Sequence, residues 1–336
     1  MHIFFLLILV ATQSAHAAAG KWRAPDEEKI SQLLLKSAGI KKVGKRLRHV
    51  SQPFVGAPYH LSPLGEGSGP DPDPLLRFDA FDCTTFVETS IALTLAENLD
   101  EARALMDVLR YRNGEVDFLQ RRHFPAAEWI PELTRLGFLR DVTRYVGRKD
   151  VVTERKVLNA TVWNRRKKPT LLELPDERIP DGTFALPVLP LNKVKKHMRR
   201  IPNGTVLNLV RVNFKTVPVR VSHQGIVIVK GGRRYLRHAA DRMYHSVVDE
   251  RLDRFVDRMS AYKRWPVAGI HLSRIIEPVG WRDLLRPTPP QKGTLWISAP
   301  AYGDGIEQMT IDPALMDAER CMEAEHGLCR SDASTT

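Results

Sequence analysis

A single cysteine at the end of a Pro- and Gly-rich stretch has the surroundings of a nucleophile. Cys83 lies in Phe81-Asp82-Cys83-Thr84-Thr85-Phe86-Val87, where that stretch gives way to an apolar segment typical of a buried helix. A helix that begins here offers the thiol backbone N–H groups and partial positive charge, which favour the reactive thiolate. The same N–H groups can hold the oxyanion formed when a thiolate attacks a carbonyl. Cys83 therefore suits acyl-transfer chemistry, although most free cysteines are small buried residues without a chemical role.

A nucleophilic thiol needs a base, and two histidines on adjacent predicted strands can supply one. His223 lies in the β-branched run 221–229, on the same face as Gly225, which leaves room for another group. His238 ends the next such run, and Gly231-Gly232 separates the two runs as a hairpin turn would. Antiparallel pairing can then set the imidazoles side by side, so that one orients the other and fixes its tautomer. The alternative is that His223 is a hydrogen-bonded core residue.

Metal-dependent and serine-dependent chemistries have less support in the sequence. Cys321, His326 and Cys329 lack a fourth ligand at zinc-like spacing, and no H-E-x-x-H or C-x-x-C occurs. No G-x-S-x-G occurs either, and the glycines of 65–69 lack the Lys-Ser/Thr ending of a phosphate-binding loop. In an oxidising compartment Cys321 and Cys329 can pair with each other, which leaves Cys83 as the odd thiol. We expect no metal and no cofactor.

The first nineteen residues have the pattern of a secretory signal. Residues 3–11 form an uninterrupted apolar run that is too short to span a bilayer, and small residues at an A-x-A-like cleavage site follow it. We therefore expect an exported protein without a transmembrane segment, in the periplasm or outside the cell. The expected organisation is a signal peptide over 1–19, one domain over 20–286 and a tail over 287–336.

Composition and charge narrow the class of protein further. The 336 residues include 51 Lys and Arg against 39 Asp and Glu, a formal charge of +12, with 43% hydrophobic residues. These values exclude a disordered chain, and three cysteines exclude a disulfide-dense scaffold. Basic runs over 41–48, 165–168 and 193–200 are either solvated faces or surfaces attracted to an anionic wall polymer or membrane. Export, and the lack of aromatic residues between the basic ones, argue against a nucleic-acid partner.

The elements that must position the candidate residues follow from apolar spacing. Helical spacing predicts helices over 26–38 and about 100–109, the latter with Asp100 as its N-cap. Residues 84–96 are apolar around most of a helix circumference, which predicts a buried helix. Ser246 and Asp249 form a capping-box pattern ahead of a further one-faced helix that contains Leu252 and Met259. Short runs of β-branched residues predict strands over 205–211, 221–229, 234–239 and 269–277.

Helices that precede strands imply an α+β domain, with the helices packed on one face of an antiparallel sheet. Residues 52–74 are expected to be loop because of their Pro and Gly content. Residues 151–200 are polar, basic and Pro-rich without clear periodicity, and we interpret them as an insertion or a cover over the site.

The order of these elements resembles the NlpC-type cysteine peptidases of the papain-like fold, which cut bacterial cell-wall peptides. The likeness rests on a buried helix headed by Asp-Cys, a strand with Ser-His-x-Gly-Ile and a following strand that ends in His-Ala. A narrower likeness is to the N-acetylmuramoyl-L-alanine amidase-like branch, long catalogued as a domain of unknown function. It is carried, in the family's order, by Gly56-Ala57-Pro58-Tyr59, by Asp-Cys-Thr-Thr-Phe-Val-Glu at 82–88, by 110–115, by Arg122-His123-Phe124 and by Trp129.

The resemblance implies a role for individual residues. Cys83 matches the nucleophile of the family, His223 its general base and His238 its third, orienting residue. Tyr59 matches a tyrosine that lines the site, and three further motif positions complete the candidate substrate-binding set. These three are Asp82, Arg112 and His123, each of which can equally be an internal hydrogen-bonding residue. The family's usual Ser-Arg-x-His-Tyr is replaced here by Gln-Arg-Arg-His-Phe at 120–124.

These expectations lead to a function. The chain is expected to be a cysteine amidase that hydrolyses N-acetylmuramoyl-L-alanine in peptidoglycan or in muropeptide fragments, or else a γ-D-glutamyl bond of the same stem peptide. The alternatives are a wall-binding module that has no activity, and an acyltransferase that uses the same thiol. We expect a monomer.

Overall fold

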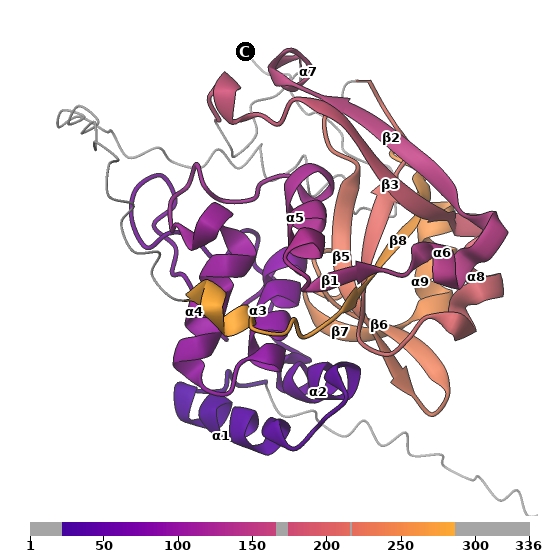
Figure 1. The fold of residues 1–336 in the computed structure, drawn as a ribbon. Helices are drawn as coiled ribbons and strands as arrows, with labels where there is room; N and C mark the ends of the chain where they lie inside the picture. The colour runs from indigo at the N-terminus through magenta and orange to yellow at the C-terminus, as the bar shows by residue number, and fades with distance from the viewer. Residues whose placement is uncertain (1–21, 166–173, 216, 286–336) are drawn as a thin grey trace, which may run out of the picture.

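The computed structural model describes residues 22–165, 174–215 and 217–285. The expected signal peptide, the tail over 287–336 and the Cys321–Cys329 pair lie outside the described residues. Along the described chain, helices come first and most strands later, as expected for an α+β fold (Figure 1).

The N-terminal helices form a layer around one buried helix. They are α1 (Glu27–Ala38), α2 (Val43–Val50), α3 (Cys83–Leu95) and α4 (Leu99–Arg110), followed by the short α5 (Ile130–Arg135). Asp26 caps α1, because its side chain accepts a hydrogen bond from the Lys29 backbone, and Gly39 follows its end. From Thr85 to Leu95 every residue of α3 is buried, which confirms the buried helix predicted from its apolar composition.

All strand pairs in the sheet are antiparallel, and the strand order is β2-β3-β8-β4-β5-β6-β7, with β1 paired to β8. The strands are β1 (Leu139–Asp141), β2 (Val152–Leu158), β3 (Gly182–Pro190), β4 (Thr205–Arg211), β5 (Val221–Lys230), β6 (Arg233–Ala240), β7 (Ser246–Arg251) and β8 (Val267–Ile275). Gly231 and Gly232 both have positive φ, which the tight turn between β5 and β6 requires. The predicted hairpin is therefore confirmed.

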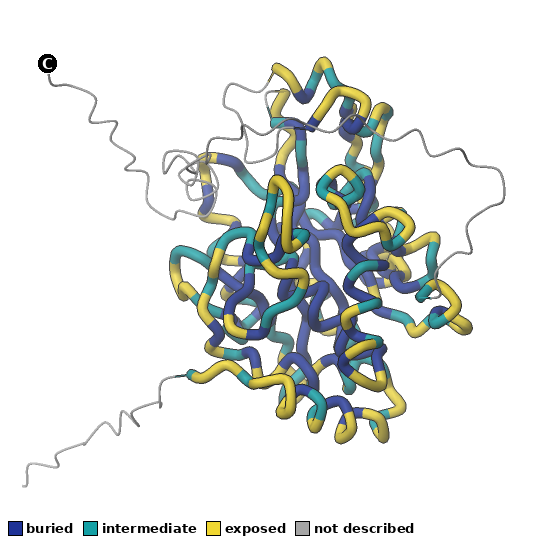
Figure 2. Tube along the Cα trace, turned by 90° about the vertical axis from the view of Figure 1, so that its left-hand side faces the viewer, coloured by how far each residue is buried: buried dark blue, intermediate teal, exposed yellow. Residues whose placement is uncertain are grey.

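Helices cover both faces of the sheet rather than the one face expected. Alternate residues of a strand point to opposite faces, and in the central strands both sets are apolar. Ile226 and Ile228 belong to the core shared with α1–α4, whereas Val227 belongs to a second core. That second core is formed with α6 (Thr143–Gly147), α8 (Leu191–His197) and α9 (Leu252–Ala261). Figure 1 shows these two groups of helices on opposite sides of the strands, and in Figure 2 the buried trace runs through the middle of the molecule.

Two predicted helix caps are wrong. Asn98 caps α4 in place of Asp100, because its Oδ1 accepts a hydrogen bond from the Glu101 backbone at 2.9 Å. The capping-box pattern of Ser246 and Asp249 lies within β7, which pairs with β6 along its whole length. Backbone pairing thus overrides a local signal that is weak by itself.

Residues 151–200 contain two strands that the sequence did not lead us to expect. β2 pairs with β3, and β3 pairs with β8, so this segment extends the sheet at one edge. The short helix α7 (Ala160–Asn164) follows β2. Within the described ranges, no helix combines the length and the apolar character that crossing a bilayer requires.

Candidate active site

Cys83 is the first residue of α3, as predicted. Asp82 is the N-cap: its carboxylate accepts from the Thr85 backbone at 2.7 Å, and the Thr85 hydroxyl accepts from the Asp82 backbone at 3.0 Å. This reciprocal pair fixes where the helix starts. The Cys83 side chain is half-buried and forms no disulfide within the described residues. The thiol is therefore held at the positive end of the helix, where the first backbone N–H groups have no intrahelical partner.

Bridges in the preceding loop attach this end of α3 to one end of the sheet. Tyr59 pairs with Phe81, which lies two residues before Cys83. The backbone N–H of Tyr59 also donates to the His245 carbonyl at 2.9 Å. Pro58 bridges Ser246, which pairs with Ala240 at the end of β6. Because β5 runs antiparallel to β6, the beginning of β5 lies at this same end.

The two candidate histidines lie side by side at that end, as predicted. Nε2 of His223 lies 2.7 Å from Nδ1 of His238, and the rings are 4.9 Å apart at an angle of 83°. Both side chains are buried, with 5% and 1% of their surface exposed. The pairing of Ile226 with Arg237 places Gly225 opposite His238, so His223 is the diagonal neighbour of His238 across the hairpin.

The absence of a side chain at Gly225 allows this arrangement. A Cβ atom at this position would lie 2.9 Å from Cβ of His238 and 2.8 Å from Cδ1 of Leu236. Such separations are shorter than van der Waals contact, so the two strands can approach this closely only because residue 225 is glycine.

We expect Gly225→Ala to lower the free energy of unfolding by about 1–3 kcal/mol, because the added methyl group overpacks this core position. Urea denaturation would measure the effect. Gly39→Ala is the matched control, since nothing lies within 4 Å of a Cβ at Gly39 and its φ is −70°. Equal stability of the Gly225→Ala and Gly39→Ala variants would contradict the packing argument.

The Glu250 carboxylate lies beside His238, and the Arg258 guanidinium lies beside that carboxylate. Nε2 of His238 lies 3.3 Å from Oε2 of Glu250, and the Glu250 carboxylate accepts from Nη2 and Nε of Arg258 at 2.7 and 3.1 Å. Burial would raise the pKa of Glu250, but the contact with His238 and the hydrogen bonds from Arg258 outweigh burial and lower it to about 2. Burial lowers the pKa of His238 to about 4 even though Glu250 opposes the change. A neutral imidazole thus lies beside a carboxylate at neutral pH.

Sequence reasoning missed Glu250 and Arg258. They reach the histidines only through the pairing of β6 with β7, where Leu236 lies opposite Glu250, and through the packing of α9. The Phe255 ring of α9 covers the pair, with its centroid 5.6 Å from that of His238 and 6.3 Å from that of His223. The histidine pair is therefore enclosed by an apolar wall on the α9 side.

The four candidate substrate-binding residues have structural partners. Tyr59 packs against the core, and Asp82 also accepts from the Ser62 backbone at 3.2 Å. Arg112 donates to Glu128 at 2.5 Å, and Nε2 of His123 lies 2.7 Å from the Phe118 carbonyl. Tyr59 and Asp82 belong to the loop that leads to Cys83, whereas Arg112 and His123 belong to the segment after α4. Substrate contact by any of the four stays a prediction.

Three buried or partly buried histidines predict that stability falls in mild acid. Burial lowers the pKa of His123 to about 3 and that of His238 to about 4, and it lowers the pKa of His271 as well. In the unfolded chain these histidines bind protons below about pH 6.5. Their contribution to the free energy of unfolding is therefore fully present above that pH and is lost as the pH decreases toward 4. His123 and His238 should each cost about 2 kcal/mol between pH 7 and pH 5.

Denaturant titrations at several pH values would measure this slope, and His123→Gln should reduce it by the share of His123. A free energy of unfolding that is unchanged between pH 7 and pH 5 would contradict the prediction.

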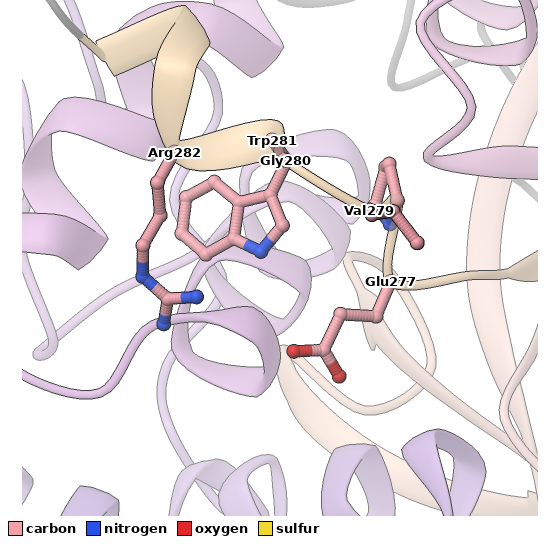
Figure 3. A pocket seen from close by; sticks show the side chains of 6 residues that line it. Glu277, Val279, Gly280, Trp281 and Arg282 are labelled. Carbon is pink, nitrogen blue, oxygen red and sulfur yellow. The ribbon is translucent and has the colours of Figure 1, made fainter.

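The pocket shown in Figure 3 lies apart from these residues. It is lined by 277–282, after the end of β8, and includes Glu277, Trp281 and Arg282. None of the candidate site residues lines it. In the part of the chain that the structure describes, no group of three or more His, Cys, Asp and Glu side chains is arranged to hold a metal ion.

Comparison of this chain with known proteins identifies a family and similar solved structures. A family model described as N-acetylmuramoyl-L-alanine amidase-like matches residues 49–262. A crystal structure of a protein from Legionella pneumophila superposes with a TM-score of 0.66 at 22% identity, over 74% of this chain and 94% of that one. An N-acetylmuramoyl-L-alanine amidase from Bacteroides uniformis superposes with a TM-score of 0.54 at 23% identity, over 74% of this chain and 99% of the other. No curated protein matches the sequence.

Proposed function

The chain belongs to the N-acetylmuramoyl-L-alanine amidase-like family, and on that premise we propose that it is a cysteine-dependent amidase acting on peptidoglycan. The observation that supports this most is the buried pair of His223 and His238, at the end of the sheet to which the loop before Cys83 is attached. A half-buried thiol at a helix N-terminus and an oriented imidazole are the parts that thiol-dependent acyl transfer needs. In this proposal the fold is of the papain-like NlpC type.

The proposed reaction has two stages. His223 takes the proton of the Cys83 thiol, and the thiolate attacks the amide carbonyl while backbone N–H groups at the start of α3 hold the oxyanion. The C–N bond breaks as the His223 imidazolium gives its proton to the leaving nitrogen, which leaves a thioester on Cys83. Water then attacks the thioester, His223 takes a proton from that water, and the acid and the thiol are released.

The proposed scissile bond joins the lactyl group of N-acetylmuramic acid to L-alanine, and the second choice is a γ-D-glutamyl bond in the stem peptide. The net charge of +12 suits a substrate that bears several carboxylates. We further propose that residues 1–19 direct export to the periplasm or the cell exterior, that 20–286 form one amidase domain, and that the protein acts as a monomer.

Incubation with a defined set of muropeptides, followed by mass spectrometry, tests the proposal. Release of a stem peptide with a free L-alanine amine supports the amidase, whereas cleavage within the peptide supports the γ-D-glutamyl bond. Transfer of the acyl group to an added amine without hydrolysis would identify an acyltransferase. Intact muropeptides that remain bound to the protein would contradict hydrolysis and support a binding module.

A further inference from the structure

The polar chain behind the histidine pair carries an inference about which nitrogen acts as the base. We propose that Glu250, through His238, is a positioning residue that keeps the proton of neutral His223 on Nε2, so that Nδ1 is the nitrogen that accepts the thiol proton. This inference rests on the proposed function for its catalytic consequence. The assignment of protons rests on the contacts alone.

The assignment begins at Arg258, because a guanidinium can only donate hydrogen bonds. Its Nε and Nη2 donate to the two oxygens of Glu250, at 3.1 and 2.7 Å. Glu250 is 7% exposed, so these bonds are what keep a buried carboxylate ionised. An ionised carboxylate can only accept, and the 3.3 Å separation from Nε2 of His238 is therefore favourable when that nitrogen carries a proton. The opposite tautomer would set a nitrogen lone pair against a buried negative charge.

The proton on His238 decides the proton on His223. Neutral His238 has a single N–H, and if it lies on Nε2 then Nδ1 is an acceptor. Nδ1 lies 2.7 Å from Nε2 of His223, which must then be the donor of this short hydrogen bond. In neutral His223 the lone pair is consequently on Nδ1. When His223 takes a proton there, its Nε2 still donates to His238, so no hydrogen bond in the chain has to reverse during catalysis.

The surroundings of His238 keep it neutral in this role. The polar or charged groups that face it come from three elements: His223 on β5, Glu250 on β7 and Arg258 on α9. The Phe255 ring lies against it from α9, and the Tyr244 ring lies 6.4 Å from it on the loop before β7. Because burial and Arg258 oppose protonation, His238 stays neutral above about pH 4. Its single proton then stays on the nitrogen that faces Glu250.

Glu250→Leu is the informative substitution, because it removes both acceptor oxygens and keeps a side chain of similar size. Glu250→Gln would not serve, since its amide oxygen can take the Oε2 position, which faces both Nη2 of Arg258 and Nε2 of His238. Without an acceptor at Nε2, the His238 proton moves to Nδ1, which then donates to Nε2 of His223 and leaves the His223 proton on Nδ1. The lone pair needed by the thiol is lost, and kcat should fall about 10²- to 10⁴-fold with little change in KM, as in other enzymes with a misoriented imidazole tautomer.

The experiment combines ¹⁵N NMR of histidine-labelled full-length protein with kinetics across pH. In wild-type protein we expect a proton on Nε2 of His223, with or without the thiol proton on Nδ1, and in Glu250→Leu a proton on Nδ1 alone. Asp249→Asn is the matched control on the same strand: Asp249 pairs with Arg237 and Lys230 rather than with the histidines, so this variant should keep the wild-type tautomers.

Three results would overturn the inference. They are a wild-type His223 protonated on Nδ1 alone, unchanged tautomers in a folded Glu250→Leu variant, and Glu250→Leu kinetics within about three-fold of wild type. The wild-type spectrum decides the matter even if the variant does not fold. Wild-type protein that cleaves no muropeptide but shows a proton on Nε2 of His223 would refute the proposed function while upholding the proton assignment.

Discussion

Cys83→Ala is expected to abolish muropeptide cleavage, with kcat/KM lower by about 10⁴-fold or more, because no thioester can form without the sulfur. The thiol is half-buried at the first position of α3, and the cap formed by Asp82 and Thr85 does not involve it. The variant should therefore unfold at the same denaturant concentration as wild type within error. Product analysis by mass spectrometry and urea denaturation check the two expectations.

Cys83→Ser tests whether the loss is chemical. A hydroxyl keeps the polar group but is a much weaker nucleophile at neutral pH, so this variant should be nearly as inactive as Cys83→Ala. Ser31→Ala on α1 is a control that should retain activity, because the Ser31 hydroxyl donates to the Glu27 carbonyl of the same helix. Cleavage by Cys83→Ala at more than about a hundredth of the wild-type rate would remove Cys83 from the mechanism.

His223→Gln is expected to lower kcat about 10³-fold or more, because the amide can hydrogen-bond to His238 but cannot take a proton from the thiol. KM should change little, since the proposed role of His223 is in the chemical step. His197→Gln is the matched control. His197 is also buried, at the end of α8, and its Nε2 lies 2.7 Å from Oδ2 of Asp150. Neither residue belongs to the candidate site.

Both histidine variants should lose some stability, and denaturation curves would show whether the losses are similar. A His223→Gln variant that is folded and cleaves as fast as His197→Gln would show that His223 is not the base.

Local signals in the sequence were enough to place the candidate nucleophile at the start of a helix and the two candidate histidines side by side. Gly231-Gly232 fixed the hairpin, and the two-residue period of the strands then put His223 and His238 on one face, where they are found 2.7 Å apart. The change from a Pro-rich stretch to an apolar one marked the start of α3 at Cys83. Each signal involves residues that are close along the chain, and tertiary packing does not compete with it.

The supporting groups could not be predicted because they depend on pairing between distant segments. Glu250 meets His238 through the β6–β7 register, and Arg258 arrives from α9. The Ser246 and Asp249 pattern suggested a helix cap, but pairing with β6 makes this segment a strand, and Asp249 instead binds Arg237.

The edge strand β2 and its neighbour β3 were missed for a related reason. Residues of β2 such as Thr153, Glu154 and Arg155 are polar or charged and lie at the surface, so the strand has little of the apolar alternation by which strands are recognised. Edge strands with charged side chains are common, since such residues discourage pairing with other chains. Only its pairing with β3 defines β2 as part of the sheet.

The central claim is that the Cys83 thiol and the His223 imidazole act as a pair, and the rate of alkylation by iodoacetamide tests it most directly. At about pH 6 an ordinary thiol, with a pKa of about 8.5, is almost entirely protonated and reacts slowly. Peptide mapping by mass spectrometry would follow Cys83 alone, with free cysteine as the reference thiol. We predict that wild-type Cys83 reacts at least about ten-fold faster than free cysteine and that His223→Gln removes this advantage. A Cys83 that reacts no faster than free cysteine, or equally fast in both proteins, would contradict the account.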